Sequence, residues 1–302
     1  MRSLFLFLAS NSDLLFQNWC DSVGIESPKA RLMTTSKSIA GRGVFATDDM
    51  EEGFTAIKIP GQIVLHEYNA AAAFPNVART IEKARKRFER RKKWWRRTLP
   101  IPGKQFEFTD TNDLWQAELT KYSLASLDLD NIWAPWILQW QRSDPMQYLL
   151  QENTSPYDED RISVCVKELH RLLPHVEEHK IKAAVDIRIR RYHELRDIFR
   201  LDDSFGKMYG FLISRALELG DGTVGVIPMF DMINHSNDPN LVLSFNGAEG
   251  AFELMAKRKI KCGEELLVCY QDQDIKTDEY SDLWAAIQWG IPVDMELSER
   301  NF

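Results

Sequence analysis

Residues 226–240 (VIPMFDMINHSNDPN) and residues 263–271 (GEELLVCYQ) decide the fold of this chain of 302 residues. In the first segment, Pro228 interrupts a short apolar run, which predicts a strand exit because proline cannot donate a hydrogen bond to a sheet. The polar residues that follow it are Asp231, Asn234 and His235. In the second segment, an apolar strand ends on Tyr270. Each segment alone is typical of turn chemistry or strand packing, but together they indicate a binding or catalytic core.

A third piece lies upstream, at residues 41–46 (GRGVFA), where Gly41 and Gly43 precede a polar turn at residues 47–53. A lone GxG pattern more often marks a turn than a ligand loop. Here it is the first of three signals in a fixed order: a glycine hairpin, an Asn-His pair and a C-terminal tyrosine. This order resembles that of the SET-domain protein methyltransferases.

Strand-like segments stand at both ends of the chain. Residues 30–60 form short apolar stretches separated by turns, and residues 208–219 predict an apolar helix that leads into the strands described above. Residues 68–207 are charged and helical in pattern, and they include a long amphipathic helix at residues 175–199. Because the strands on either side need each other to form a core, the sequence predicts one α+β fold, a β-core of short strands interrupted by a large helical insert.

This arrangement resembles the Rubisco large-subunit methyltransferase-like class of SET proteins, in which a helical insert interrupts the SET core. Residues 133–136 (WAPW), 276–279 (KTDE) and 288–291 (QWGI) are similar to further motifs of that class. Members of the class usually carry another helical substrate-binding domain, which we expect to be missing from this chain because little sequence remains after position 292. The expected division is residues 12–67 for the first half of the SET domain, 68–207 for the insert, 208–292 for the second half and 293–302 for a tail.

The resemblance implies an S-adenosyl-L-methionine-dependent protein N-methyltransferase, with protein lysine as the expected acceptor. It makes Tyr270 the catalytic residue, whose hydroxyl would orient the acceptor amine near the transferring methyl group. The amine must be neutral, and a narrow apolar channel lowers its pKa by desolvation. Actin-type histidine methylation and a catalytically weak SET-fold module that binds protein or ribonucleoprotein remain alternatives. The residues that the resemblance assigns to the cofactor are Gly41, Gly43, Phe54, Ala56, Arg215, Asp231, Asn234, His235, Trp289 and Ile291.

Two departures from the class pattern bear on activity. Members of the class place an aromatic residue shortly after the Asn-His pair to wall the lysine channel, whereas residues 241–243 are LVL and Phe245 is the candidate substitute. The tyrosine is followed by Gln271 rather than by glycine or aspartate. An altered acceptor or a reduced activity therefore stays open.

The composition narrows the class of protein further. Apolar residues make up 44% of the chain, which is enough for a full core. The four cysteines lack metal-ligand spacing, so we expect a reducing compartment and no metal. Residues 4–9 (LFLFLA) are too short for a membrane span or a usual signal-peptide core. We therefore expect a cytoplasmic protein without membrane association, the nucleus or an organelle being alternatives. SET enzymes that act on histones often carry Cys-rich zinc clusters, so we expect a non-histone substrate.

Charge is concentrated in residues 83–97 (KARKRFERRKKWWRR), a run that begins at Lys83 and ends at Arg97. Its ten lysines and arginines face the single acid Glu89, which gives the run a charge of +9 and leaves −16 for the remainder of a chain whose net charge is −7. Such a run is most often one solvated helix. A ribosomal, nucleic-acid or acidic-protein partner is the alternative.

Overall fold

The computed structural model describes most of the chain, in ranges separated by gaps. The described residues are 11–35, 38, 41–98, 114–129, 131–140, 159–201, 204–220, 222–270, 283, 286 and 287. The chain forms two compact units that do not follow chain order. The first unit comprises Met1–Leu65, Ile132–Arg142 and Val226–Lys276, and the second comprises His66–Asn131, Ser143–Gly225 and Thr277–Phe302.

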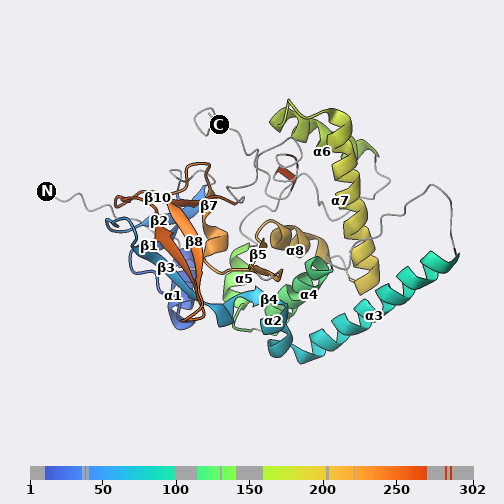
Figure 1. Ribbon diagram of the computed structural model, residues 1–302, viewed down its shortest axis with the longest axis horizontal. Coiled ribbons are helices and arrows are strands. Elements are labelled where there is room, and N and C mark those ends of the chain that lie inside the picture. The colour runs from blue at the N-terminus through green and yellow to red at the C-terminus, as the bar shows by residue number, and fades with distance from the viewer. Residues whose placement is uncertain are drawn as a thin grey trace. The chain divides into compact units, whose positions relative to one another are not determined.

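The first unit contains two small sheets (Figure 1). In one of them, with the order β1-β2-β10-β7, β2 is antiparallel to both of its neighbours and β10 runs parallel to β7. The bounds are β1 Ala30–Thr34, β2 Arg42–Ala46, β7 Asn234–His235 and β10 Glu265–Val268. Gly41 enters β2 with a φ of 76°, a left-handed conformation that glycine adopts without steric cost. Strands from both ends of the chain thus share one sheet, which confirms the α+β core predicted from the sequence.

The second sheet of this unit is antiparallel throughout, with the order β3-β9-β8. Its bounds are β3 Thr55–Pro60, β8 Leu241–Asn246 and β9 Ala251–Ala256. The remaining elements are α1 Asn11–Ser22, α5 Ala134–Trp140, and the 3₁₀ turns η1 Gly61–Ile63 and η3 Phe230–Met232. The rings of Trp19 and Trp136 stack with centroids 6.1 Å apart, which packs α1 on α5. Residues 132–142, although within the range expected for the insert, therefore group with the first unit.

The second unit is mostly helical. Its helices are α2 Glu67–Ala73, α3 Pro75–Thr98, α4 Trp115–Asp128, α6 Glu159–Leu172, α7 Glu178–Phe199 and α8 Ser204–Ile213. Short strands follow α8, with β5 (Leu217–Glu218) antiparallel to β6 (Val224–Val226). Another short strand, β4 (Leu65–His66), marks the passage from the first unit to the second. Helix α3 begins on Pro75, whose fixed φ suits the first helical position.

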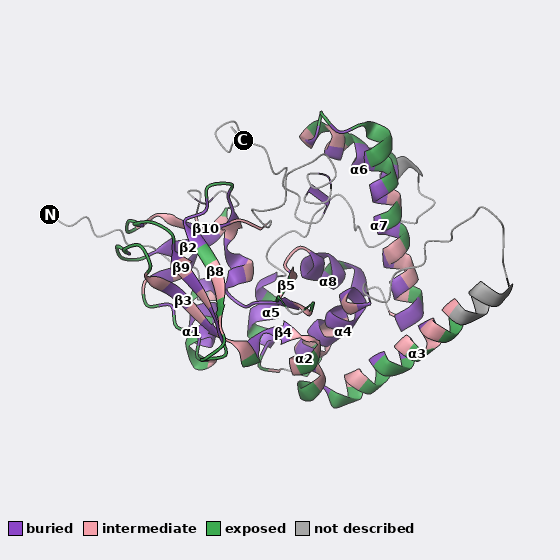
Figure 2. Cartoon of the chain, viewed as in Figure 1, coloured by how far each residue is buried: buried purple, intermediate pink, exposed green. Residues whose placement is uncertain are grey.

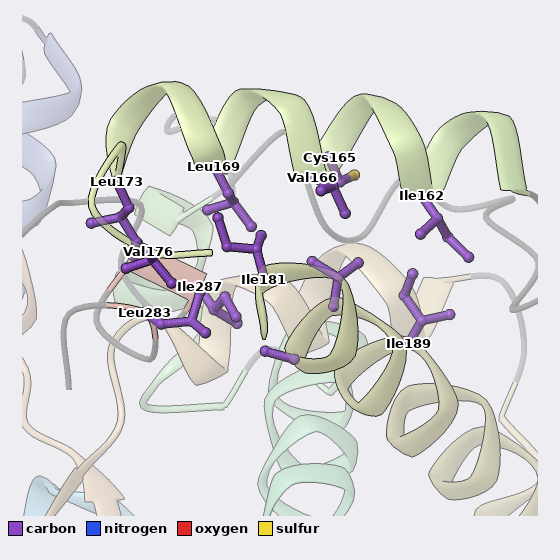
Figure 3. Close-up of a cluster of buried hydrophobic side chains, with 13 residues drawn as sticks. Ile162, Cys165, Val166, Leu169, Leu173, Val176, Ile181, Ile189, Leu283 and Ile287 are labelled. Carbon is purple, nitrogen blue, oxygen red and sulfur yellow. The ribbon is translucent and has the colours of Figure 1, made fainter. Parts of the chain in front are cut away.

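One core of the second unit lies between α6 and α7 (Figure 3). Leu169 of α6 and Ile181 of α7 meet in it, as Figure 3 shows. Residues far along the chain complete this core, namely Leu283, Ala286 and Ile287, which are all at most 3% exposed. The helical insert and a late segment of the chain therefore share apolar contacts.

The burial pattern follows the elements (Figure 2). Along β3 the buried residues Ile57 and Ile59 flank the half-buried Lys58, which is the alternation expected of a strand with one covered face.

In the described ranges, no helix has the length and apolar character needed to cross a membrane. The same ranges hold no cluster of three or more histidine, cysteine, aspartate or glutamate side chains placed to bind a metal ion.

Candidate functional site

The Asn-His pair and the tyrosine meet because β7 and β10 are parallel neighbours. In this pairing Leu267 lies opposite Asn234 and Val268 lies opposite His235. β10 therefore ends beside the Asn-His pair and brings Tyr270 there, 35 positions along the chain from His235. All of these residues belong to the first unit.

His235 is held as a neutral imidazole in one tautomer. Its Nδ1 accepts the backbone N–H of Tyr270 at 3.1 Å, so this nitrogen carries no proton. The ring proton is then on Nε2, which lies 3.0 Å from Oδ1 of Asn237 and donates to it. Burial lowers the pKa of His235, because desolvation disfavours the imidazolium. His235 thus fixes the backbone at the end of β10.

Tyr270 is anchored at its hydroxyl as well as at its backbone. The hydroxyl donates to the carbonyl oxygen of Ile233 at 2.6 Å. The Tyr270 ring lies 5.3 Å from that of His235, centroid to centroid, with the planes tilted by 47°. Because the phenolic proton is donated to a carbonyl, the hydroxyl oxygen can meet a further hydrogen-bond partner only as an acceptor.

The side-chain amide of Asn234 is oriented by three acceptors around its Nδ2. These are Oε1 of Glu265 at 2.7 Å, the backbone oxygen of Arg42 at 2.8 Å and Oγ of Ser38 at 3.1 Å. Ser38 also donates its hydroxyl to Oε1 of Glu265 at 2.9 Å. Nδ2 is therefore used within the fold, and Oδ1 of Asn234 is the atom left to face a ligand.

Gly43 makes room for this network. A Cβ atom at Gly43 would lie 2.9 Å from Nδ2 of Asn234 and would overlap Oε1 of Glu265. A side chain here would displace both groups. A Cβ atom at Gly41 would meet nothing within 4 Å, so Gly41 is required for its backbone conformation instead. Direct cofactor contact by either glycine stays a prediction.

Three polar positions around the site were not identified from the sequence: Ser38, Glu265 and Asn240. The side chain of Asn240 bonds to one backbone carbonyl and one backbone N–H of β10. Its Nδ2 donates to Glu265 O at 2.8 Å, and its Oδ1 accepts from Leu267 N at 2.8 Å. It is 1% exposed and ties the end of the 226–240 segment to β10. Its signal in the sequence was the asparagine that closes NDPN. No local signal marks Ser38, which contacts Glu265 from 227 positions away.

Asp231, predicted to contact the cofactor, is occupied by two indoles of α5. Nε1 of Trp140 donates to Oδ2 at 2.8 Å, and Nε1 of Trp136 lies 3.1 Å from both carboxylate oxygens. A carboxylate held by these donors connects η3 to α5 and gives a structural role to Trp136, the last residue of the WAPW segment. Asp231 therefore supports the turn that carries Asn234, and its direct contact with a cofactor stays a prediction.

The other predicted residues belong to other elements of the chain. Phe54 precedes β3 beneath the ammonium of Lys29, 4.9 Å from its ring centroid, and Ala56 is fully buried within β3, a strand of the second sheet. Arg215 belongs to the second unit, where its Nη1 donates to Ser214 Oγ at 3.0 Å. Their assignment to the cofactor stays a prediction. Trp289 and Ile291 lie outside the described residues.

Phe245, the candidate aromatic wall, lies on β8, the edge strand of the second sheet. Its side chain is 58% exposed and packs on Phe252, with ring centroids 4.9 Å apart. These contacts place it in the β8–β9 hairpin, and its role toward an acceptor stays a prediction.

Comparison with known proteins finds lysine methyltransferases among the relatives of this chain. Histone-lysine N-methyltransferase SMYD3 of Mus musculus is 34% identical over 134 residues, which cover 44% of this chain and 28% of that protein. N-lysine methyltransferase setd6 of Salmo salar is 23% identical over 262 residues, which cover 84% of this chain and 53% of that protein. The chain thus spans about half, or less, of the length of the curated relatives that it matches.

Solved structures share the fold. Rubisco LSMT bound to sinefungin and monomethyllysine superposes with a TM-score of 0.54 at 17% identity, over 94% of this chain and 57% of that one. The SET domain of LSMT bound to lysine and AdoHcy gives 0.55 at 16% identity, over 93% and 57%. The profile of the SET domain family matches residues 41–271, a range that contains the glycine hairpin, the Asn-His pair and Tyr270. The chain therefore belongs to the SET domain family.

Proposed function

We propose that this protein is an S-adenosyl-L-methionine-dependent protein N-methyltransferase that acts on lysine. The observation that carries the proposal is the convergence of Asn234, His235 and Tyr270 at the junction of β7 and β10. Two curated relatives are named as lysine methyltransferases. Proteins of the same fold have been solved with AdoMet, AdoHcy and lysine.

The site suits the amino-acid end of the cofactor. In the described part of the chain, Oδ1 of Asn234 takes no hydrogen bond, so it is available to accept one from an ammonium group. Because three acceptors hold Nδ2, this oxygen is fixed before any ligand arrives, which lowers the entropic cost of binding. When bound, S-adenosyl-L-methionine supplies an electrophilic methyl group on a sulfonium centre. Asn234 would hold its ammonium, and His235 would keep Tyr270 beside it.

Tyr270 would orient the substrate amine by accepting a hydrogen bond from it. Because its hydroxyl donates a hydrogen bond to the carbonyl oxygen of Ile233, it would meet the incoming amine as an acceptor of an N–H and so direct the nitrogen lone pair toward the methyl group. With the cofactor bound, the same oxygen would stabilise the positive charge of the reacting centre electrostatically. The amine must lose its own proton first, which desolvation in an apolar channel favours.

We propose a non-histone protein as the substrate and the cytoplasm as the compartment. The compartment is supported by the four cysteines, at positions 20, 165, 262 and 269, which remain thiols rather than forming disulfides. A non-histone substrate is supported by the lack of a Cys-rich metal cluster among the residues that the structure describes.

The first test is calorimetric titration of the protein with S-adenosylhomocysteine, the reaction product. We expect one-to-one binding that falls at least about tenfold in Asn234→Ala, which removes the fixed acceptor. A flat titration from folded protein would refute the cofactor site.

The second test is transfer of labelled methyl groups to cell-extract proteins, followed by acid hydrolysis and amino-acid analysis. Methyllysine is expected, whereas methylhistidine would change the acceptor. Tyr270→Phe should lose about 10²-fold or more of the rate while still binding S-adenosylhomocysteine. Tyr68→Phe, on an exposed tyrosine of α2, is the matched control and should be unaffected. Cofactor binding without transfer to any protein would instead support a SET-fold binding module.

A further inference from the structure

Helix α3 carries a basic surface to which the proposed methyl transfer assigns no role. We propose that this surface binds the phosphate backbone of nucleic acid. The basic stripe is defined by Arg79, Lys83, Lys86 and Arg90, all of which are exposed. Their spacing of four, three and four residues places one cation on each successive turn of the same helix face. Lys93 and Arg97 continue this interval in the sequence of α3.

The opposite face of α3 anchors the helix. Ile81, Ala84 and Phe88 are at most 4% exposed, at the i, i+3, i+7 spacing of a buried stripe. Packing on this face fixes the orientation of the helix, so the basic stripe faces solvent, as the exposed residues along α3 in Figure 2 show. The stripe is therefore preorganised and does not need to fold on contact with a ligand.

Other cations of α3 serve the fold. Arg85 pairs with Glu67 at 2.7 Å and with the buried carboxylate of Glu118. The burial of Glu118 raises its pKa, against the opposing effect of Arg85. Arg87 donates to the backbone oxygen of Ile198 at 3.2 Å. These two arginines are structural and are not part of the stripe.

Acidic side chains neutralise little of the positive charge of the basic stripe. Lys83 makes no hydrogen bond or ion pair within the described ranges. The same is true of the exposed Arg91, which follows Arg90 in the sequence. Among the residues that the structure describes, Arg79 and Arg90 donate to neutral oxygens, on Asn76 and on the Lys86 backbone. Lys86 meets the exposed Glu82 one turn away, a surface pair that contributes little energy. Such a line of cations suits a polyanion.

The chemistry of this face favours phosphate over a protein or a membrane. Within positions 79–91 of α3, every exposed residue is polar or charged. A protein-binding surface needs a desolvated apolar or aromatic centre, and positions 79–91 of this face offer none. A membrane-bound helix inserts its apolar face into lipid, whereas Ile81 and Phe88 are already packed inside the unit. Because the chain outside residues 83–97 carries −16, binding should be confined to α3 and should weaken steeply with salt.

The test measures binding of the whole protein to a fluorescein-labelled 20-nucleotide RNA and to a DNA duplex of the same length, by anisotropy at several salt concentrations. The variant is Lys83→Gln, Lys86→Gln and Arg90→Gln together, which leaves the buried face untouched. Its control carries Lys257→Gln, Lys259→Gln and Lys261→Gln, three exposed cations between β9 and β10. Both variants lose three charges, so the protein's total charge cannot explain a difference between them.

For the unaltered protein we expect log-log salt slopes of about −3 to −4, corresponding to four phosphate contacts. The α3 variant should bind at least about tenfold more weakly at low salt, and the control should stay within about twofold. No binding by the unaltered protein, or equal losses in the two variants, would overturn the proposal. So would capture by anionic lipid vesicles or by a poly-glutamate peptide in preference to nucleic acid. Unchanged affinity of the α3 variant for S-adenosylhomocysteine shows that its fold is intact, and separates this result from the proposed methyl transfer.

Discussion

Nδ1 of His235 accepts the backbone N–H of Tyr270 at 3.1 Å, so the two residues hold each other across β7 and β10. The hydroxyl of the same tyrosine reaches the carbonyl of Ile233 at 2.6 Å. Residues 233–235 thus fix Tyr270 both at its backbone N–H and at its hydroxyl. An acceptor amine would meet a hydroxyl that is already oriented, so little reorganisation is needed at the moment of transfer.

Asn237 should control the pH range of activity through His235. Its Oδ1 accepts a hydrogen bond from Nε2–H of His235. This keeps the ring proton on Nε2, so Nδ1 is unprotonated and accepts the N–H of Tyr270. In Asn237→Asp, the new carboxylate stabilises the imidazolium and raises the pKa of His235. Protonated Nδ1 cannot accept a hydrogen bond, so transfer should fall by about tenfold per pH unit below that raised pKa.

The comparison for this prediction is Asn237→Ala, which removes the fixing contact without adding charge. It should lower the rate evenly across pH, whereas Asn237→Asp should move the acid limb of the rate profile upward. Superimposable profiles for the two variants and the unaltered protein would show that Asn237 does not set the tautomer.

His235 should also make stability depend on pH. Its pKa is lowered in the folded protein from the usual 6.5, because burial penalises the charged ring. Below pH 6.5 the unfolded chain binds a proton that the folded chain does not, so stability falls as the pH falls toward the folded pKa. Above 6.5 the effect vanishes. Urea unfolding from pH 8 to pH 5 should therefore show a smaller loss in His235→Asn than in the unaltered protein, and equal losses would contradict this account.

Local patterns predicted the strands better than they predicted the network between them. Alternating or continuous apolar runs marked β2 and β10, and the predicted helix at residues 175–199 is confirmed as α7. The helix expected at residues 208–219 was too long, because α8 ends at Ile213 and β5 then pairs with β6. The contact of Ser38 with Glu265 was unpredictable, since it arises only when two strands from opposite ends of the chain become neighbours.

Gly43→Ala should be strongly destabilising. The added methyl would lie 2.9 Å from Nδ2 of Asn234 and would overlap Oε1 of Glu265, so both must move. Overpacking of this kind costs about 1–3 kcal/mol, and the loss of a charged hydrogen bond adds to it. The control is Gly247→Ala, where a Cβ would meet only the Phe245 ring at 4.0 Å. Urea unfolding should separate the two variants by at least about 1 kcal/mol, and comparable midpoints would mean that the network yields easily.

Trp140→Phe tests whether Asp231 has a structural role. The substitution keeps most of the ring volume but removes the indole N–H that donates to Oδ2 of Asp231 at 2.8 Å. Loss of one hydrogen-bond donor to this partly buried carboxylate should lower the free energy of unfolding by about 1–3 kcal/mol. Affinity for S-adenosylhomocysteine should change by less than about threefold, because the lost contact lies on the α5 side of η3 and leaves the amide of Asn234 in place. Calorimetry and urea unfolding on the same sample decide the matter. A large loss of affinity with unchanged stability would instead place Asp231 in the cofactor site, as the sequence resemblance implied.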